Sequence, residues 1–358
     1  MILPTTYALT LAVLLLSMLC WGSWANTLKK SGWRFELYYL DFSLGAVIAA
    51  CLAAYTLGSM GPDITVQDNF LLTGKKQIAL AFVAGCVFNL ANMLIVAAID
   101  LAGMSVAFPV GIGLALIVGV VVNFVMQRVG NPVFLFGGCA LVLIAVVLSA
   151  LAHGKMQALR KKIAAANAPA PEVQEVSSSR RRKPVKEEEP GAYRGVILAI
   201  AGGLLMGSFY PIVNVAMEGE LGLNNPYALA LVFSFGIFFS TFVFNLYFMN
   251  LPVKGAPTSF FAYFTGRMGQ HFLGLLGGVI WMVGAISNFV GAAAHGDANV
   301  GPAVSYGLGQ GATLVSVMWG LLVWKEFEGA DGGIKRLLTL MTLLFVLGLT
   351  SVAIAPLK

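Results

Sequence analysis

Long apolar stretches separated by short polar segments dominate the pattern of this chain. Each stretch is close to the roughly 20 residues that an α-helix needs to cross the hydrocarbon of a bilayer. The strands of a membrane barrel would instead show short segments of alternating polarity, so we expect every span to be helical. The pattern predicts ten spans, at residues 6–27, 40–59, 77–99, 103–126, 133–152, 195–215, 227–249, 272–294, 300–324 and 337–355.

The composition agrees with a bilayer as the main solvent. Hydrophobic residues make up 58% of the chain and charged residues 11%, and the mean hydropathy is +0.85. The net charge of +6 does not indicate a nucleic-acid partner, because the basic residues form short runs between apolar stretches. The four cysteines lack the spacing of a zinc site or a disulfide and are interpreted as packed or lipid-facing thiols: Cys20, Cys51, Cys86 and Cys139.

Lysine and arginine are distributed unevenly between the segments that join the spans. With the N-terminus outside, 18 of the 22 basic residues fall on the cytoplasmic side, as the positive-inside rule requires. We therefore expect a multi-pass protein of a bacterial-type inner (plasma) membrane, with both termini outside. Residues 154–193 carry serine, basic and acidic runs and are predicted to be a disordered cytoplasmic linker between the halves 1–153 and 194–358. A regulatory or lipid-binding role for this linker stays open.

The two halves resemble each other in sequence. Gly85, Gly103 and Pro109 are repeated at one constant offset by Gly278, Gly296 and Pro302. Because five is an odd number, two related units of five spans insert with opposite orientation, as in many secondary transporters. The predicted fold is an all-α membrane protein of ten transmembrane helices in two inverted five-helix repeats. The matched prolines Pro109 and Pro302 are expected to kink the fourth and ninth spans beside a central cavity.

Polar side chains inside the spans are the first candidates for a binding site. An amide in hydrocarbon is costly unless it faces protein or a watery cavity, which favours Asn89, Asn92 and Asn288 as substrate-binding residues. The alternative is that these amides only bond across helices. Three further asparagines lie nearer the span ends, where capping or interfacial roles are favoured: Asn123, Asn214 and Asn245.

Aromatic residues form a second group of candidates, since planar solutes and sugars stack on aromatic rings. Those within the spans are Trp21, Trp24, Trp281 and Tyr306. Gln310 follows Tyr306 by one helical turn and is expected to share its face. Helix packing remains the alternative for this group. The glycines around Gln310 have a spacing typical of close helix contact and do not indicate a nucleotide loop.

Ionisable residues are scarce within the spans. Asp41 begins the second span, where it is a candidate for proton coupling. The alternative is that it stabilises a helix N-terminus and pairs with Lys29, Lys30 or Arg34. Glu326 is expected to form a surface ion pair with the adjacent Lys325. The sequence predicts no catalytic residue, no metal site and no cofactor, because HExxH, paired intramembrane aspartates and a serine/histidine arrangement are all missing.

Several motifs resemble the ureide permease family of the drug/metabolite transporter (DMT) superfamily and, within the same superfamily, bacterial sugar porters. They are Gly22-Ser23-Trp24, Tyr39-Leu40-Asp41-Phe42, Gly103-Met104-Ser105-Val106, Gly119 with Asn123-Phe124, and the run from Trp319 to Phe327. The resemblance extends over nearly the whole chain apart from the linker. It implies uptake of small neutral polar solutes such as allantoin, nucleobases or sugars by proton symport. Plant members carry a phosphate-loop-like sequence in the central loop, whereas residues 154–193 contain no GxxxxGK[ST], so ATP is not expected as a ligand.

The predicted function is therefore that of a permease that works by alternating access, with a small-molecule substrate and the lipid bilayer as its partners. A homodimer through the fifth and tenth spans is possible. Two alternatives stay open: a multidrug or metabolite exporter of the same superfamily, and a membrane sensor or assembly subunit that does not transport.

Overall fold

The computed structural model describes residues 1–166, 191–252 and 256–357, and throughout these ranges the secondary structure is helical, as predicted. The long helices are α1 (Tyr7–Ser23), α3 (Phe35–Tyr55), α5 (Lys75–Ala102), α6 (Met104–Met126), α7 (Pro132–Ala166), α8 (Gly191–Met217), α9 (Pro226–Asn250), α11 (Met268–Ala292) and α14 (Gly332–Ile354). The short helices are α2 (Ala25–Ser31), α4 (Val66–Leu72), α10 (Phe261–Phe264), η1 (Gly296–Ala298), α12 (Gly301–Gly309), α13 (Ala312–Leu322) and η2 (Ala355–Leu357).

Nine helical stretches of the described residues are long and apolar enough to cross a membrane. They correspond to nine of the ten predicted spans. The exception is the span predicted at 300–324, which the structure divides into α12 and α13 with a turn at Gln310 and Gly311. Glycine is a poor helix former, and Gln310 lies between Gly309 and Gly311, so the helix breaks where the sequence is weakest.

Two other boundaries differ from those expected. Helix α7 continues to Ala166, so the first part of the predicted linker is helical, and residues 167–190 lie outside the described residues. Helix α1 passes at Trp24 into the short helix α2, which ends at Gly32 in the left-handed conformation that glycine adopts without strain.

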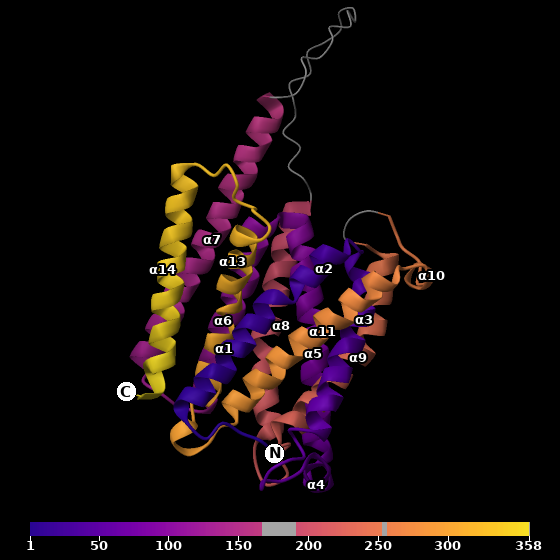
Figure 1. Cartoon of the computed structure of the whole chain (residues 1–358), viewed down its shortest axis with the longest axis vertical. Coiled ribbons are helices and arrows are strands. Elements are labelled where there is room, and N and C mark those ends of the chain that lie inside the picture. The colour runs from indigo at the N-terminus through magenta and orange to yellow at the C-terminus, as the bar shows by residue number, and fades with distance from the viewer. Residues whose placement is uncertain (167–190, 253–255, 358) are drawn as a thin grey trace, which may run out of the picture.

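The helices form one bundle with two distinct ends (Figure 1). Both chain termini lie at one end, together with α4, and we call it the terminal end. The C-terminal part of α7 and helix α10 lie at the opposite end, which we call the linker end. Helices α7 and α14 pack side by side along one flank of the bundle, and α3, α9 and α11 pack together on the other.

Two helix crossings bring backbones unusually close. At the crossing of α3 and α11, a Cβ atom added to Gly278 would lie 1.9 Å from the carbonyl oxygen of Phe42. At the crossing of α5 and α9, a Cβ atom added to Gly85 would lie 2.1 Å from the carbonyl oxygen of Phe233. Only glycine permits these approaches, and small residues at such positions are the usual basis of tight helix packing in membranes.

Candidate functional site

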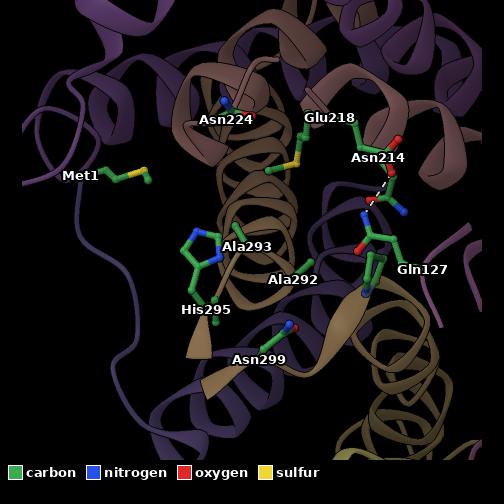
Figure 2. Close-up of a pocket in the computed structure, with 12 residues that line it drawn as sticks. Met1, Gln127, Asn214, Glu218, Asn224, Ala292, Ala293, His295 and Asn299 are labelled. Atoms are coloured by element: carbon green, nitrogen blue, oxygen red, sulfur yellow. Dashed lines mark hydrogen bonds between the residues drawn. The ribbon is translucent and has the colours of Figure 1, made fainter. Parts of the chain in front are cut away.

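A pocket with polar and apolar lining residues opens at the terminal end of the bundle (Figure 2). Its volume is about 400 Å³. Exposed side chains, including Glu218, His295 and Asn299, lie at its rim, whereas Asn214 and Pro302 are buried in its wall. The lining residues are Met1, Gln127, Asn214, Met217, Glu218, Asn224, Ala292, Ala293, Ala294, His295, Asn299 and Pro302.

The walls of the pocket lead toward a group of buried polar side chains. Residues four positions apart lie on the same face of a helix, one turn above the other. Four lining residues have such a neighbour one turn deeper in the bundle: Gln127 has Asn123, Asn214 has Tyr210, Ala292 has Asn288 and Pro302 has Tyr306. All four neighbours are buried. One helical turn below the pocket, on four helices, there is therefore a group that we call the polar network: Asn123, Tyr210, Asn214, Asn288, Ser305 and Tyr306.

Asn288 is the centre of the polar network. Its Oδ1 atom accepts a hydrogen bond of 2.6 Å from the hydroxyl of Tyr210 and lies 3.0 Å from Oγ of Ser305. Its Nδ2 atom donates to the carbonyl oxygen of Ser305 at 3.1 Å and approaches Oγ of Ser17 at 3.4 Å. One amide thus links α1, α8, α11 and α12.

The remaining members connect α6 to the same group. Asn214 donates from Nδ2 to Oδ1 of Asn123. The Nδ2 atom of Asn123 in turn donates to the carbonyl oxygen of Gly119 at 2.6 Å. The ring of Tyr306 packs against Gly119, and its hydroxyl lies 3.2 Å from the carbonyl oxygen of Met206. No charged side chain takes part in these bonds, so the polar network is suited to neutral groups.

Aromatic rings pack together below the polar network, on the side away from the pocket. Trp281 stacks on Trp21, with ring centroids 6.0 Å apart and planes at 20°. It also packs against Phe88 at 4.3 Å and lies nearly parallel to Phe233 at 6.3 Å. Trp24 follows Trp21 by three residues toward the linker end, and its ring centroid lies 5.0 Å from that of Phe42. The three predicted tryptophans therefore belong to one region of the bundle.

The other predicted amides lie elsewhere. Asn89 and Asn92 bond to two different helices. Asn89 donates from Nδ2 to Ser240 at 2.8 Å on α9, whereas Asn92 donates to the hydroxyl of Tyr39 at 3.0 Å on α3. Neither lines the pocket described above. Gln310 lies at the turn between α12 and α13.

The two predicted prolines differ in position. Pro109 lies inside α6, as a kink would require. Pro302 lines the pocket but lies in the first turn of α12, where proline removes no intrahelical hydrogen bond. The predicted kink at Pro302 is therefore wrong, and the interruption of this span occurs at Gln310 and Gly311 instead.

Asp41 lies near the linker end and is almost fully buried. Its Oδ1 atom accepts a hydrogen bond of 2.5 Å from the hydroxyl of Tyr263 on α10, and its Oδ2 atom lies 2.8 Å from Nδ1 of His271 on α11. Trp33 packs against the rings of both partners. The expected pairing of Asp41 with nearby basic residues is therefore wrong: Arg34 pairs with Glu36, and Lys29 pairs with Glu326.

Glu326 forms a second cluster at the linker end. Its carboxylate binds Lys29 of α2, rather than the adjacent Lys325, and lies 3.8 Å from Nε2 of His153 on α7. Arg160 of α7 donates to its backbone carbonyl at 2.6 Å. The neighbouring His153 and then Lys29 lower the pKa of Glu326 to about 2, against the opposing effect of burial. We call Glu326, Lys29, His153 and Arg160 the Glu326 cluster.

Two further tryptophans, Trp319 and Trp324, make hydrogen bonds near the linker end. The indole N–H of Trp319 donates to Ser23 at 2.8 Å, and that of Trp324 donates to Asn26 at 2.6 Å. The Nζ atom of Lys29 also lies 4.3 Å from the ring centroid of Trp324. Side chains of the ninth span thus fasten α13 and the segment after it to α1 and α2.

Several residues of these sites were not singled out from the sequence. Gln127 and His295 line the pocket, and Tyr263 and His271 hold Asp41. Asn123 and Asn214 were ranked below the other asparagines because they lie near span ends. The pocket lies at one end of the bundle, so Asn214 lines it and Asn123 lies one turn below its lining residue Gln127. Among the residues that the structure describes, no cluster suited to a metal ion occurs, and the four cysteines are free thiols.

Comparisons with known proteins give the chain its family. The family model for ureide permeases matches residues 38–193 and 179–355. Ureide permease 1 of Arabidopsis thaliana is 25% identical, over 94% of each chain, and ureide permease 2 of the same plant is 24% identical, over 94% of each. The probable ureide permease A3 of Vigna unguiculata is 22% identical, over 89% of this chain and 95% of its own. The chain therefore belongs to the ureide permease family, whose members are multi-pass membrane transporters and not enzymes.

Proposed function

We propose that this protein is a secondary active transporter that carries small neutral polar solutes across the membrane by alternating access. The observation that supports this most directly is the contrast between the two ends of the bundle. A pocket of about 400 Å³ opens at the terminal end, one helical turn above the polar network. The linker end is closed by the Glu326 cluster and by what we call the Asp41 cluster: Asp41, Tyr263 and His271.

The substrate class follows from the chemistry of the polar network and from the relatives. Amide and hydroxyl groups offer both donors and acceptors without net charge, which suits a neutral solute with several polar atoms. The names of the relatives point to ureides. Nucleobases and sugars share these chemical properties, and the resemblance to sugar porters of the DMT superfamily makes them the next candidates.

Alternating access between two inverted five-span halves is supported by matched contacts. Gly45 of the second span packs on the carbonyl of Leu275 in the eighth, and Gly236 of the seventh packs on the carbonyl of Phe82 in the third. The second span of each half thus meets the third span of the other half in the same way. Gly103 and Gly296, which match in the sequence repeat, both have a positive φ, of 77° and 59°. In this proposal the ninth span also crosses the membrane, although it is divided into α12 and α13, and this brings the total to ten crossings. Discontinuous helices of this kind form binding sites in other transporters.

Import is the proposed direction of transport, as the resemblance to ureide permeases implies. The basic residues predict that the linker end faces the cytoplasm, which places both termini and the open pocket outside. The structure then corresponds to a state that is open to the outside, which import by alternating access requires. A homodimer, if formed, would use the flank of α7 and α14, where Leu343, Leu347 and Val133 are exposed to lipid or to a second copy.

Proton coupling is the proposed source of energy, with Asp41 as the proton-binding residue. It is a buried carboxylate, and its partners Tyr263 and His271 belong to the other half of the chain. Protonation of Asp41 would remove its charge and weaken its bonds to both partners.

The test is uptake by proteoliposomes that contain only the purified protein. Radiolabelled allantoin, uracil and glucose are offered with and without an inward proton gradient. We expect accumulation of one class, stimulated by the gradient, and no accumulation by Asn288→Leu vesicles, in which the centre of the polar network is lost. A second assay measures whether cells that overexpress the protein resist hydrophobic cations. Resistance in this assay without uptake of any solute by proteoliposomes would favour the exporter alternative. Inactivity in both assays would favour a sensor or an assembly subunit.

A further inference from the structure

Buried polar atoms without a hydrogen-bond partner are rare in proteins and call for an explanation. Among the described residues, three such side-chain atoms occur: Nε1 of Trp21, Oδ1 of Asn89 and Oδ1 of Asn245. Both asparagines are bonded through their Nδ2 atoms. Trp21 has a single polar group, so its indole N–H is a donor left wholly without a partner.

The indole of Trp21 lies in a slot between α11 and α12. A Cβ atom added to Gly284 would lie 2.7 Å from Cδ1 and 3.0 Å from Nε1 of the indole. A Cβ atom added to Gly309 would lie 2.6 Å from Cζ3 of the same ring and 3.1 Å from Nδ2 of Asn288. Two glycines thus admit the indole, and one of them also contacts the central amide of the polar network.

Helix α11 shows where this slot lies along the route from the pocket. Ala292 lines the pocket, Asn288 lies one turn deeper, and Gly284 lies one further turn below it. On the neighbouring helix, the slot residue Gly309 is the last residue of α12, directly before the break in the ninth span. In secondary transporters, binding sites lie at such helix breaks. The unpaired donor is therefore located where a solute that passes the polar network would arrive.

We infer that the indole N–H of Trp21 is the hydrogen-bond donor that recognises a carbonyl oxygen of the transported solute. The solute would have a planar edge that carries the carbonyl and would lie between Trp21 and the amide of Asn288. The N–H is closed off in the present conformation, so the solute reaches it when the side chains of the polar network rearrange. This inference rests on the proposed function and adds to it a residue that determines specificity: the solute must present an acceptor to this donor.

The test uses ligand binding by the purified protein and therefore does not depend on transport. The probes are hydantoin and 2,4-dithiohydantoin, in which weaker sulfur acceptors replace both carbonyl oxygens. Apparent affinities are measured from the ligand-induced rise in the thermal unfolding temperature. For the wild-type protein we expect hydantoin to bind about tenfold more tightly, the ratio that corresponds to one hydrogen bond of about 1.4 kcal/mol.

The decisive variant is Trp21→Phe, which keeps an aromatic ring and removes the donor. We expect hydantoin affinity to fall about tenfold and the preference over the dithio analogue to disappear. Trp319→Phe is the matched control, because its indole N–H is already paired with Ser23 at the linker end, and this variant should keep the preference. If Trp21→Phe does not fold, Trp21→Leu serves instead, because it also removes the donor and its side chain is smaller than the indole.

The outcomes separate this inference from the proposed function. An unchanged preference in Trp21→Phe would overturn the role of the indole while leaving transport intact. A wild-type protein that hydantoin does not stabilise would also overturn it. Failure of allantoin uptake by the wild-type protein, together with normal hydantoin binding, would count against the proposed transport and not against the donor role of Trp21.

Discussion

The Nδ1 atom of His271 on α11 lies 2.8 Å from Oδ2 of Asp41 on α3, and this contact joins the two halves of the chain near the linker end. The hydroxyl of Tyr263 on α10 occupies the other carboxylate oxygen. Gly274 packs directly on the Cβ atom of Asp41, so α3 and α11 are held close together at this level. In the proposed transport cycle, opening the linker end would separate these two helices and break the bonds of Asp41 to Tyr263 and His271.

The first prediction concerns Asp41→Asn. The amide cannot take up a proton, so we expect gradient-driven accumulation to be lost while exchange of labelled for unlabelled solute continues. The measurement is uptake by proteoliposomes with an imposed proton gradient, next to equilibrium exchange without one. Glu36→Gln is the control, because Glu36 pairs with Arg34 outside the Asp41 cluster. Gradient-driven accumulation by Asp41→Asn at the wild-type level would exclude Asp41 as the coupling residue.

The second prediction concerns the Glu326 cluster. Because the pKa of Glu326 is lowered to about 2, the stabilisation from its ion pairs is present above the ordinary carboxylate range and is lost only as the pH falls through about 2. Between pH 5 and 8 Glu326 therefore stays ionised, and its contribution to this closure is expected not to change with pH. Removal of the charge by Glu326→Gln should weaken the closure at every pH in that range.

Exposure of the buried residue Thr27 reports on this closure. Thr27→Cys is placed in a variant without the four native cysteines and labelled with an impermeant maleimide from the linker side. We expect the labelling rate to rise several-fold with Glu326→Gln and to be unchanged with Glu328→Gln, a nearby carboxylate outside the cluster. Equal rates in all three proteins would show that the Glu326 cluster does not hold the linker end closed.

The sequence predicts most of the architecture because membrane spans depend on local hydropathy. Nine of the ten predicted spans match long helices of the structure. The break at Gln310 and Gly311 was not predicted, because glycines within an apolar run leave the hydropathy high. The available signal was a polar Gln310 between two glycines, and this pattern was interpreted only as close helix packing.

The site is less predictable because its partners are distant in sequence. Asn288 was identified from burial cost alone, but its bonds to Tyr210 and Ser17 depend on how α1, α8 and α11 pack. Asp41 was recognised as unusual, yet its contacts come from residues more than 200 positions away. The alternative for Asp41 was a pair with a nearby basic residue. The structure instead pairs Lys29 with Glu326 and Arg34 with Glu36.

The third prediction concerns Asn288→Ala. This change removes an acceptor of the Tyr210 hydroxyl and both amide bonds, and unpaired buried groups cost about 1–3 kcal/mol each. We expect a clear fall in the thermal unfolding temperature in detergent together with loss of solute uptake. The control is His295→Ala at the exposed rim of the pocket, which should leave the unfolding temperature unchanged because its side chain makes no cap hydrogen bond. A fully stable and active Asn288→Ala protein would contradict a central role for this amide.

The fourth prediction tests whether the two close crossings are equivalent. A methyl group at Gly278 would meet a backbone carbonyl of α3 at 1.9 Å, and backbone cannot move aside as a flexible side chain does. Overpacking of this kind costs typically 1–3 kcal/mol or more, so Gly278→Ala should lower the unfolding temperature markedly. Gly269→Ala, on the same helix with open space around it, should be neutral or slightly stabilising, because alanine is the better helix former. Gly85→Ala meets the corresponding carbonyl of α9 at 2.1 Å and should cost about as much as Gly278→Ala. If only one of the two variants is destabilised, the crossings are not equivalent and the case for two inverted halves is weakened.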